Sequence, residues 1–177
     1  MKKIIIICGL IAGIIVTSWM WVAMFGIFKA EGSLLLGYTT MLVAFSMVFV
    51  GVKNYRDKQN DGIITFGKAF KIGLMITLIA STIYVLVWMV DYYYFVPDYI
   101  DKYAAAMLVK LKASGASQAE IQKQAADMRH YSQLYKNPFY NAMFTYGEIL
   151  PVGLIVTIIC ALVLKRKQKE DSVILAA

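Results

Sequence analysis

One carboxylate stands inside a stretch of sequence that is otherwise free of charge, and it is the side chain best placed to carry out chemistry. Glu148 lies within residues 139–164, which hold no other charged residue. An ionisable side chain inside a membrane-spanning segment is costly to bury and often marks a proton or ion pathway. Glu148 therefore points to two alternatives: a proton- or ion-coupled site, or a structural carboxylate near the membrane interface.

The depth of Glu148 favours the structural alternative. At about 1.5 Å per residue, Glu148 lies about 25 Å along a helix from Lys165, which would mark one edge of the membrane. In a hydrocarbon core about 30 Å thick, the carboxylate then lies about 5 Å inside the opposite edge, where it can reach water or a cation. Pro151 cannot donate a backbone hydrogen bond to the carbonyl of Gly147, so a kinked and hydrated helix is expected there.

The other reactive residue types show no catalytic pattern. His130 is the single histidine, and a metal site needs several ligands. Cys8 and Cys160 would lie at similar depths beside a reducing compartment, which predicts free thiols. The sequence has no HExxH, no GxSxG and no phosphate-binding glycine loop. We therefore expect no enzyme activity, no metal and no cofactor.

Long apolar segments indicate the elements that must position Glu148. Hydrophobic residues make up 60% of the 177-residue chain and charged residues 16%, against about 45–50% and 25% in soluble domains. A spanning helix needs about 20 apolar residues. Four segments qualify, and Glu148 is the only charge within them. The predicted fold is therefore an all-α membrane protein, a single membrane domain with spans at residues 4–28, 34–52, 72–90 and 139–164.

The distribution of basic residues predicts the orientation. Basic residues near spans stay in the cytoplasm, and they gather at the N-terminus, in the loop after the second span and at the C-terminus (Lys2, Lys3, Lys53, Arg56, Lys58, Lys68, Lys71, Lys165, Arg166, Lys167, Lys169). Both termini are therefore expected in the cytoplasm. The first apolar run is longer than that of a signal peptide, so we expect it to stay as a span. The net charge of +7 then reflects topology and contact with membrane lipid, and no nucleic-acid partner is expected.

The loop at residues 91–138 predicts a helical hairpin on the extracytoplasmic side. Apolar residues recur at helical spacing in its first half (Ile100, Tyr103, Met107, Leu108, Leu111). Asp98 is a potential cap for that helix, Gly115 a natural stop, and Ser117 with Glu120 forms a capping box that opens a second helix. The hairpin could be a lid that packs on the bundle or a docking surface for a partner, and the lid is favoured because no chemistry lies on it.

The loop between the second and third spans carries turn and cap signals. Asp61 followed by Gly62 is typical of a turn, and Thr65 is placed to cap a helix that begins at Phe66. Lys68 and Lys71 would then lie at the headgroup level, where lysines extend toward water or pair with lipid phosphates. In the first span, Gly9 and Gly13 form a GxxxG pattern that permits close helix packing. We favour packing within the monomer over a dimer seam.

Two stretches of the sequence read FVGVKNYRD at residues 49–57 and TFGKAFKIG at residues 65–73, and a glycine–tyrosine pair opens the second span. Together they resemble the family known as domain of unknown function DUF4199. With the four spans and the long loop between the third and fourth, the resemblance extends over nearly the whole chain. It implies a small multi-pass protein of the bacterial inner membrane and supplies no catalytic residue. The motif positions it marks as candidates are Tyr55, Arg56, Asp57, Lys68 and Lys71.

Two functional classes remain. The favoured one is a non-enzymatic accessory or scaffold protein with a protein partner or a homo-oligomeric state. The alternative is a small transporter or ion- or proton-coupled protein that uses Glu148.

Overall fold

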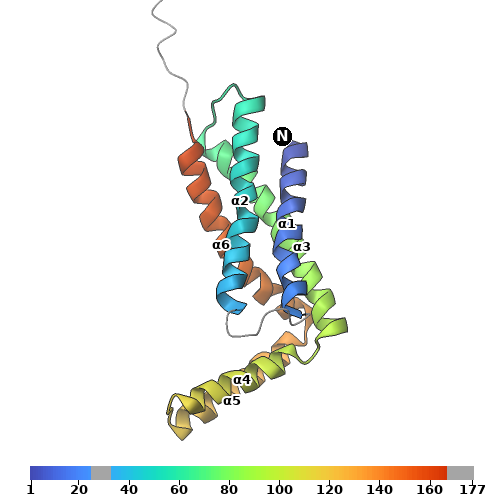
Figure 1. Cartoon of the computed structure of the whole chain (residues 1–177), viewed down its shortest axis with the longest axis vertical. Coiled ribbons are helices and arrows are strands. Elements are labelled where there is room, and N and C mark those ends of the chain that lie inside the picture. The colour runs from blue at the N-terminus through green and yellow to red at the C-terminus, as the bar shows by residue number, and fades with distance from the viewer. Residues whose placement is uncertain (25–32, 167–177) are drawn as a thin grey trace, which may run out of the picture. The chain divides into compact units, whose positions relative to one another are not determined.

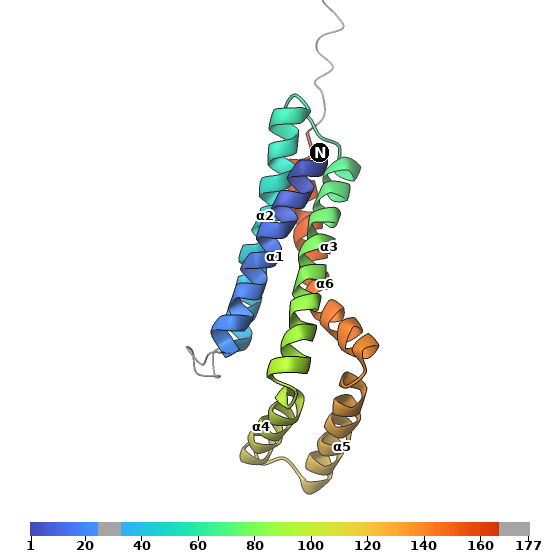
Figure 2. The same cartoon turned by 90° about the vertical axis from the view of Figure 1, so that its right-hand side faces the viewer.

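The computed structural model describes residues 1–24 and 33–166. In these ranges the chain is helical, with one isolated antiparallel bridge between Ile64 and Arg166. The helices are labelled in Figure 1, and Figure 2 shows them from the side: α1 (Lys2–Met24), α2 (Ser33–Gln59), α3 (Phe66–Val90), the π-helical turn η2 (Asp91–Phe95), α4 (Tyr99–Ala113), α5 (Gln118–Tyr135) and α6 (Pro138–Leu164).

The chain divides into two compact units. The first, called the bundle unit here, contains Met1–Tyr84 and Glu148–Ala177. The second, the hairpin unit, contains Val85–Gly147. The helices α3 and α6 each contribute residues to both units.

Three of the described helical segments are long and apolar enough to cross a membrane: Leu35–Gln59, Phe66–Phe95 and Pro138–Leu164. They correspond to the second, third and fourth predicted spans. The first predicted span coincides with α1 over most of its length, but its residues 25–28 lie outside the described ranges, as do Lys167 and Lys169. The all-helical, membrane-like character is therefore confirmed, and the count of four spans remains a prediction.

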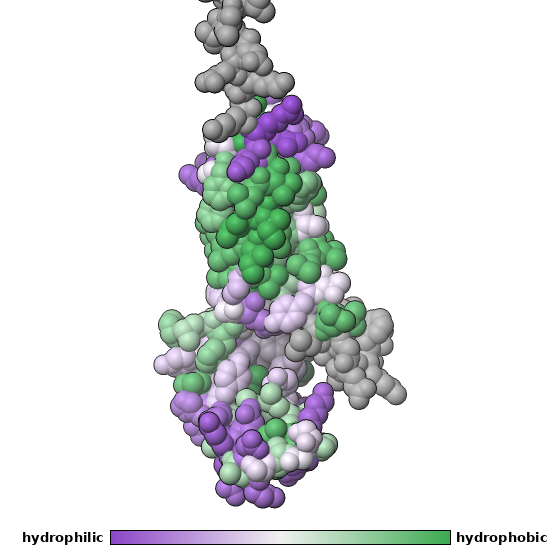
Figure 3. Space-filling model, turned by 90° about the vertical axis from the view of Figure 1, so that its left-hand side faces the viewer, coloured by the Kyte–Doolittle hydropathy of each residue, from purple (hydrophilic) through white to green (hydrophobic). Residues whose placement is uncertain are grey.

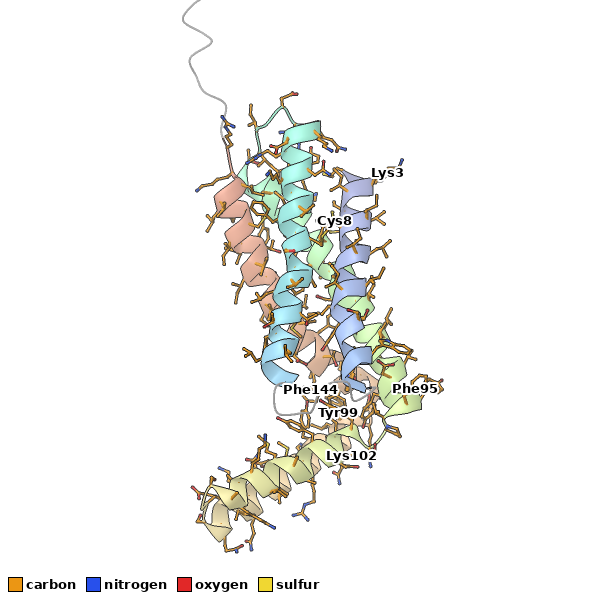
Figure 4. The ribbon with its side chains drawn as sticks, viewed as in Figure 1. Lys3, Cys8, Phe95, Tyr99, Lys102 and Phe144 are labelled. Atoms are coloured by element: carbon orange, nitrogen blue, oxygen red, sulfur yellow. The ribbon has the colours of Figure 1, made fainter. Side chains whose placement is uncertain are left out.

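Glycines bring the helices of the bundle unit into close contact. The Cβ positions of Gly9 and Gly13 fall against Ile79 and Ile83 of α3, so the GxxxG pattern packs within the monomer, as expected. At Gly51, the Cβ position lies 3.3 Å from the Sγ of Cys8, which is labelled on α1 in Figure 4. Cys8 and Cys160 are both free thiols, as predicted. Since a side chain at these glycines would collide with the neighbouring helix, the close packing depends on their lacking one.

The bundle core contains one polar pair. Thr77 of α3 and Thr157 of α6 are almost fully buried, and their hydroxyl oxygens lie 3.0 Å apart. A second contact joins the Thr77 hydroxyl to the carbonyl of Gly153 at 3.5 Å. Buried hydroxyls need such partners, so the pair satisfies itself across the α3–α6 contact.

The third apolar helical segment is longer than the sequence indicated. The predicted span ends at residue 90, whereas the helical backbone continues through η2 to Phe95. The sequence predicts the end of the span before Asp91, because a charge normally marks the water boundary. Here Asp91 is only 1% exposed, and the tyrosines after it extend the apolar segment. The helix ends before Pro97, since the residue preceding a proline disfavours helical backbone.

The helices of the hairpin unit follow the predicted signals closely. Gly115 has a φ of +79°, the left-handed conformation that ends α4. Ser117 and Glu120 form the predicted capping box at the start of α5. Asp98 precedes α4 but makes no capping hydrogen bond through its side chain. Its carboxylate instead pairs with Lys102 at 2.7 Å, so the prediction that Asp98 caps the helix was wrong in this detail.

Replacing Ser117 by alanine is expected to destabilise the first turn of α5 by about 1 kcal/mol. The backbone N–H and the hydroxyl of Ser117 donate to Glu120 and hold the pKa of Glu120 below its usual value. A lowered folded pKa means that the carboxylate stabilises the fold above its unfolded pKa of about 4.3, and that this stability is lost as the pH falls through the folded pKa. Hydrogen exchange of the α5 amides, corrected for intrinsic rates, should show protection decreasing below about pH 4.

The matched control for this titration is Glu120→Gln. It keeps the hydroxyl cap of Ser117 and removes the ionisable group, so its protection should not change over the same acidic range. If the protection of the α5 amides in Glu120→Gln decreased with acid as it does in the natural chain, the loss would not come from the Glu120 carboxylate.

Candidate functional site

The motif residues meet at one end of the bundle unit, where α2 ends and α3 begins. Tyr55 is buried, with 7% of its surface exposed. The Nζ of Lys68 lies 5.1 Å from the centre of the Tyr55 ring, a cation–π contact. The same ammonium group donates to Oδ1 of Asn60 at 3.3 Å. Lys68 is thereby held over the loop that separates the two motif stretches.

Two further motif residues tie this loop to the end of α6. The Nε of Arg56 lies 2.6 Å from Oδ1 of Asp57, and Nη1 of Arg56 donates to the carbonyl of Leu164 at 3.4 Å. The last carbonyls of a helix have no partner within the helix, so Arg56 satisfies one of them. Two backbone hydrogen bonds between Ile64 and Arg166, at 3.1 and 2.8 Å, join the same elements.

The start of α3 is fixed by the predicted cap. The hydroxyl of Thr65 accepts from the backbone N–H of Lys68 at 3.4 Å, and Asp61 and Gly62 both have positive φ in the turn before it. Lys71 is exposed and stands apart from these contacts. The structure therefore brings together Tyr55, Arg56, Asp57 and Lys68 where the end of α2, the start of α3 and the end of α6 meet. The arrangement fixes the helix ends.

Glu148 lies on the exposed surface of α6. Its neighbour Ile149 is fully buried in the bundle core, so the carboxylate projects on the side away from that core. A polar path through the bundle would need Glu148 to face inward. Its outward position instead exposes it to lipid, interfacial water or another polypeptide.

The hairpin unit contains a cluster of aromatic and hydroxyl groups, with Tyr99 and Phe144 labelled in Figure 4. The indole Nε1 of Trp88 donates to the hydroxyl of Tyr135 at 2.6 Å, and that hydroxyl lies 3.5 Å from Oγ1 of Thr145. The rings of Tyr92 and Tyr135 meet edge to face at 5.1 Å. The residues of α3, α5 and α6 that form this cluster all belong to the hairpin unit, so the cluster holds that unit together.

Asp91 is the residue that the sequence reasoning missed. It lies one turn after Trp88 and directly before Tyr92, within the helical segment Phe66–Phe95. Both of its carboxylate oxygens are buried and have no hydrogen-bond partner. The available signal was the run of Tyr92, Tyr93, Tyr94 and Phe95 after it, which continues the apolar segment past the charge.

No metal centre forms among the described residues, in which no three His, Cys, Asp or Glu side chains lie close enough to share an ion. The chain matches a family described as protein of unknown function (DUF4199) over residues 7–166. Neither the curated proteins nor the solved structures yielded a match.

Proposed function

This chain belongs to the DUF4199 family of proteins of unknown function, and from that premise we propose that it is a non-enzymatic accessory or scaffold protein of the bacterial inner membrane. It crosses the membrane four times, with α1 as the first span. Both termini lie in the cytoplasm and the α4–α5 hairpin lies outside it.

The apolar surface of the bundle is the observation that carries this proposal. Large aliphatic side chains such as Leu42, Ile155 and Val163 are more than 45% exposed, at 55%, 58% and 66%. Figure 3 shows one face of the bundle covered by such residues. An exposed apolar surface of this extent is typical of helices that lie in lipid.

The orientation rests on where the basic residues gather. The start of α1, the end of α2, the start of α3 and the end of α6 lie at one end of the bundle (Figure 1). Lys2, Lys3 and the basic motif residues lie at that end. Since positive residues beside spans stay in the cytoplasm, this end faces the cytoplasm.

The accessory role rests on the build of the hairpin unit. The helices α4 and α5 hold each other through a hydrogen bond of 2.7 Å from Ser132 to Asp101. This leaves apolar side chains on α4 exposed, among them Tyr103 at 45% and Val109 at 66%. A helix pair that supports itself and presents such residues is suited to docking another protein, so we propose the docking surface in place of the lid that the sequence favoured.

Photocrosslinking in intact cells tests this role. With benzoylphenylalanine at position 109 of the full chain, we expect one discrete protein adduct, because Val109 faces outward on α4. The matched control is position 155 of α6, where contact with lipid should give no discrete adduct. A second, differently tagged copy of the chain shows whether the adduct is a homo-oligomer.

The transporter alternative makes the opposite prediction. The purified protein in liposomes would conduct protons or ions, and Glu148→Gln would abolish that flux. Such a flux, together with no adduct at position 109, would overturn the accessory role.

A further inference from the structure

Asp91 presents an electrostatic problem that the accessory role leaves unsolved. Its side chain is 1% exposed, and neither Oδ1 nor Oδ2 has a hydrogen-bond partner. Nearly all buried polar groups in folded proteins are paired. An ionised carboxylate without a partner is among the costliest groups to bury. The carboxyl group of Asp91 must therefore be neutral or must hold a ligand.

The backbone around Asp91 departs from a regular helix. The carbonyl of Asp91 accepts from the N–H of Val96 at 2.9 Å, five residues further on, which is the π-helical pattern. Such turns are rare and often lie at functional sites. This geometry is an observation independent of the unpaired carboxyl oxygens, and it occurs at the same residue.

A second buried polar group lies beside the same turn. Asn141 of α6 is fully buried, and its side chain interacts with that of Tyr93. Tyr93 follows Asp91 by two residues, and its hydroxyl donates to the carbonyl of Lys136 at 3.1 Å. The start of α6 therefore packs against the turn that carries Asp91 without supplying a partner for its carboxyl group.

The charged and titratable neighbours in this unit do not neutralise Asp91. Tyr92 and Tyr93 on the same turn and Tyr135 from α5 are phenols. Asp101 of α4 lies near Tyr92, and its carboxylate accepts from Ser132. Lys102 is paired with Asp98. Among the described residues, no lysine or arginine bonds to the Asp91 carboxyl group.

We propose that Asp91 is a proton-binding site, which holds its carboxyl group as the neutral acid in the folded protein at neutral pH. Both carboxyl oxygens are shielded from water, because the side chain is only 1% exposed.

Infrared spectroscopy of the full chain tests this assignment. The protein is prepared with carboxyl-13C aspartate in detergent at neutral pH. A carboxylic-acid C=O band that carries the isotope shift is expected, and it should disappear in Asp91→Asn. Labelling aspartate alone removes Glu148 from the measurement. The matched control is Asp127→Asn, which removes an exposed carboxylate and should leave the band unchanged.

Two further variants keep the test decisive. Asp91→Glu should retain an acid band if glutamate is labelled as well. If Asp91→Asn does not fold, the band is assigned by its persistence in six single variants that replace each of the other aspartates by asparagine: Asp57→Asn, Asp61→Asn, Asp98→Asn, Asp101→Asn, Asp127→Asn and Asp171→Asn. An absent acid band at neutral pH would overturn the proposal. A carboxylate band that shifts when sodium replaces choline would overturn it in favour of a metal cation.

Proton linkage provides a second readout. If the folded chain keeps the proton and the unfolded chain releases it above about pH 4, the unfolding equilibrium constant rises by up to tenfold per pH unit. Asp91→Asn should lack this component. If the unfolding equilibrium constants of the natural chain and of Asp91→Asn changed equally with pH over the neutral range, Asp91 would not be a proton-binding site.

Discussion

Replacing Tyr135 by alanine is expected to destabilise the hairpin unit by about 3–5 kcal/mol. Tyr135 is 5% exposed. Its ring meets Tyr92 and Tyr131 at 5.1 and 5.4 Å, and its hydroxyl accepts from Trp88. The truncation removes a large buried ring and leaves the indole N–H without its acceptor. Hydrogen exchange of the α5 amides in detergent measures the loss directly.

Two matched variants separate the contributions of the ring and the hydroxyl. Tyr135→Phe keeps the ring and removes the acceptor of the indole N–H, which should cost about 1–3 kcal/mol. Tyr94→Ala truncates a neighbouring tyrosine that is 80% exposed, and it should change stability by less than about 0.5 kcal/mol. Equal effects of Tyr135→Ala and Tyr94→Ala would show that the cluster does not hold this unit together.

The second large effect is expected at Gly153 of α6. A Cβ at this position would lie 2.7 Å from Cζ of Phe45, and nearer still to the γ-methyl carbon of Thr77. Phe45 is 1% exposed and cannot move without disturbing the core. Gly153→Ala should therefore destabilise the bundle unit by about 1–3 kcal/mol, measured by thermal unfolding in detergent.

The same helix supplies the control for this substitution. A Cβ at Gly147 meets no atom within 4 Å. Gly147→Ala should therefore raise stability by up to about 1 kcal/mol through helix propensity alone. If Gly153→Ala were as stable as Gly147→Ala, the close contact between Gly153 of α6 and Phe45 would not exist in the folded protein.

Local signals in the sequence predicted most of the helix ends correctly. The capping box at Ser117, the stop at Gly115 and the cap at Thr65 each involve residues within one turn of each other. Asp91 violated the rule that a charge marks the end of a span, because it is almost fully buried in the folded chain. The sequence could not reveal that burial, so the third apolar segment was predicted too short.

The candidate site was predictable only in part. The family resemblance pointed to Tyr55, Arg56, Asp57 and Lys68, and the structure shows them in one place. The contact of Arg56 with Leu164 joins residues that are far apart in sequence, so no local pattern could give it. The orientation of Glu148 was equally hidden, because the residues of α6 are apolar around most of its circumference and do not indicate which side faces the core.

The paired hydroxyls of Thr77 and Thr157 have an evolutionary consequence. Losing Thr77 leaves the hydroxyl of Thr157 without its partner, and losing Thr157 leaves Thr77 only the 3.5 Å contact with the carbonyl of Gly153. Exchanging both for valine removes the need for a partner altogether. A substitution at one of the two positions therefore favours a substitution at the other. Among relatives of this protein, they should covary, and a lineage that has lost one threonine is under selection to lose the other.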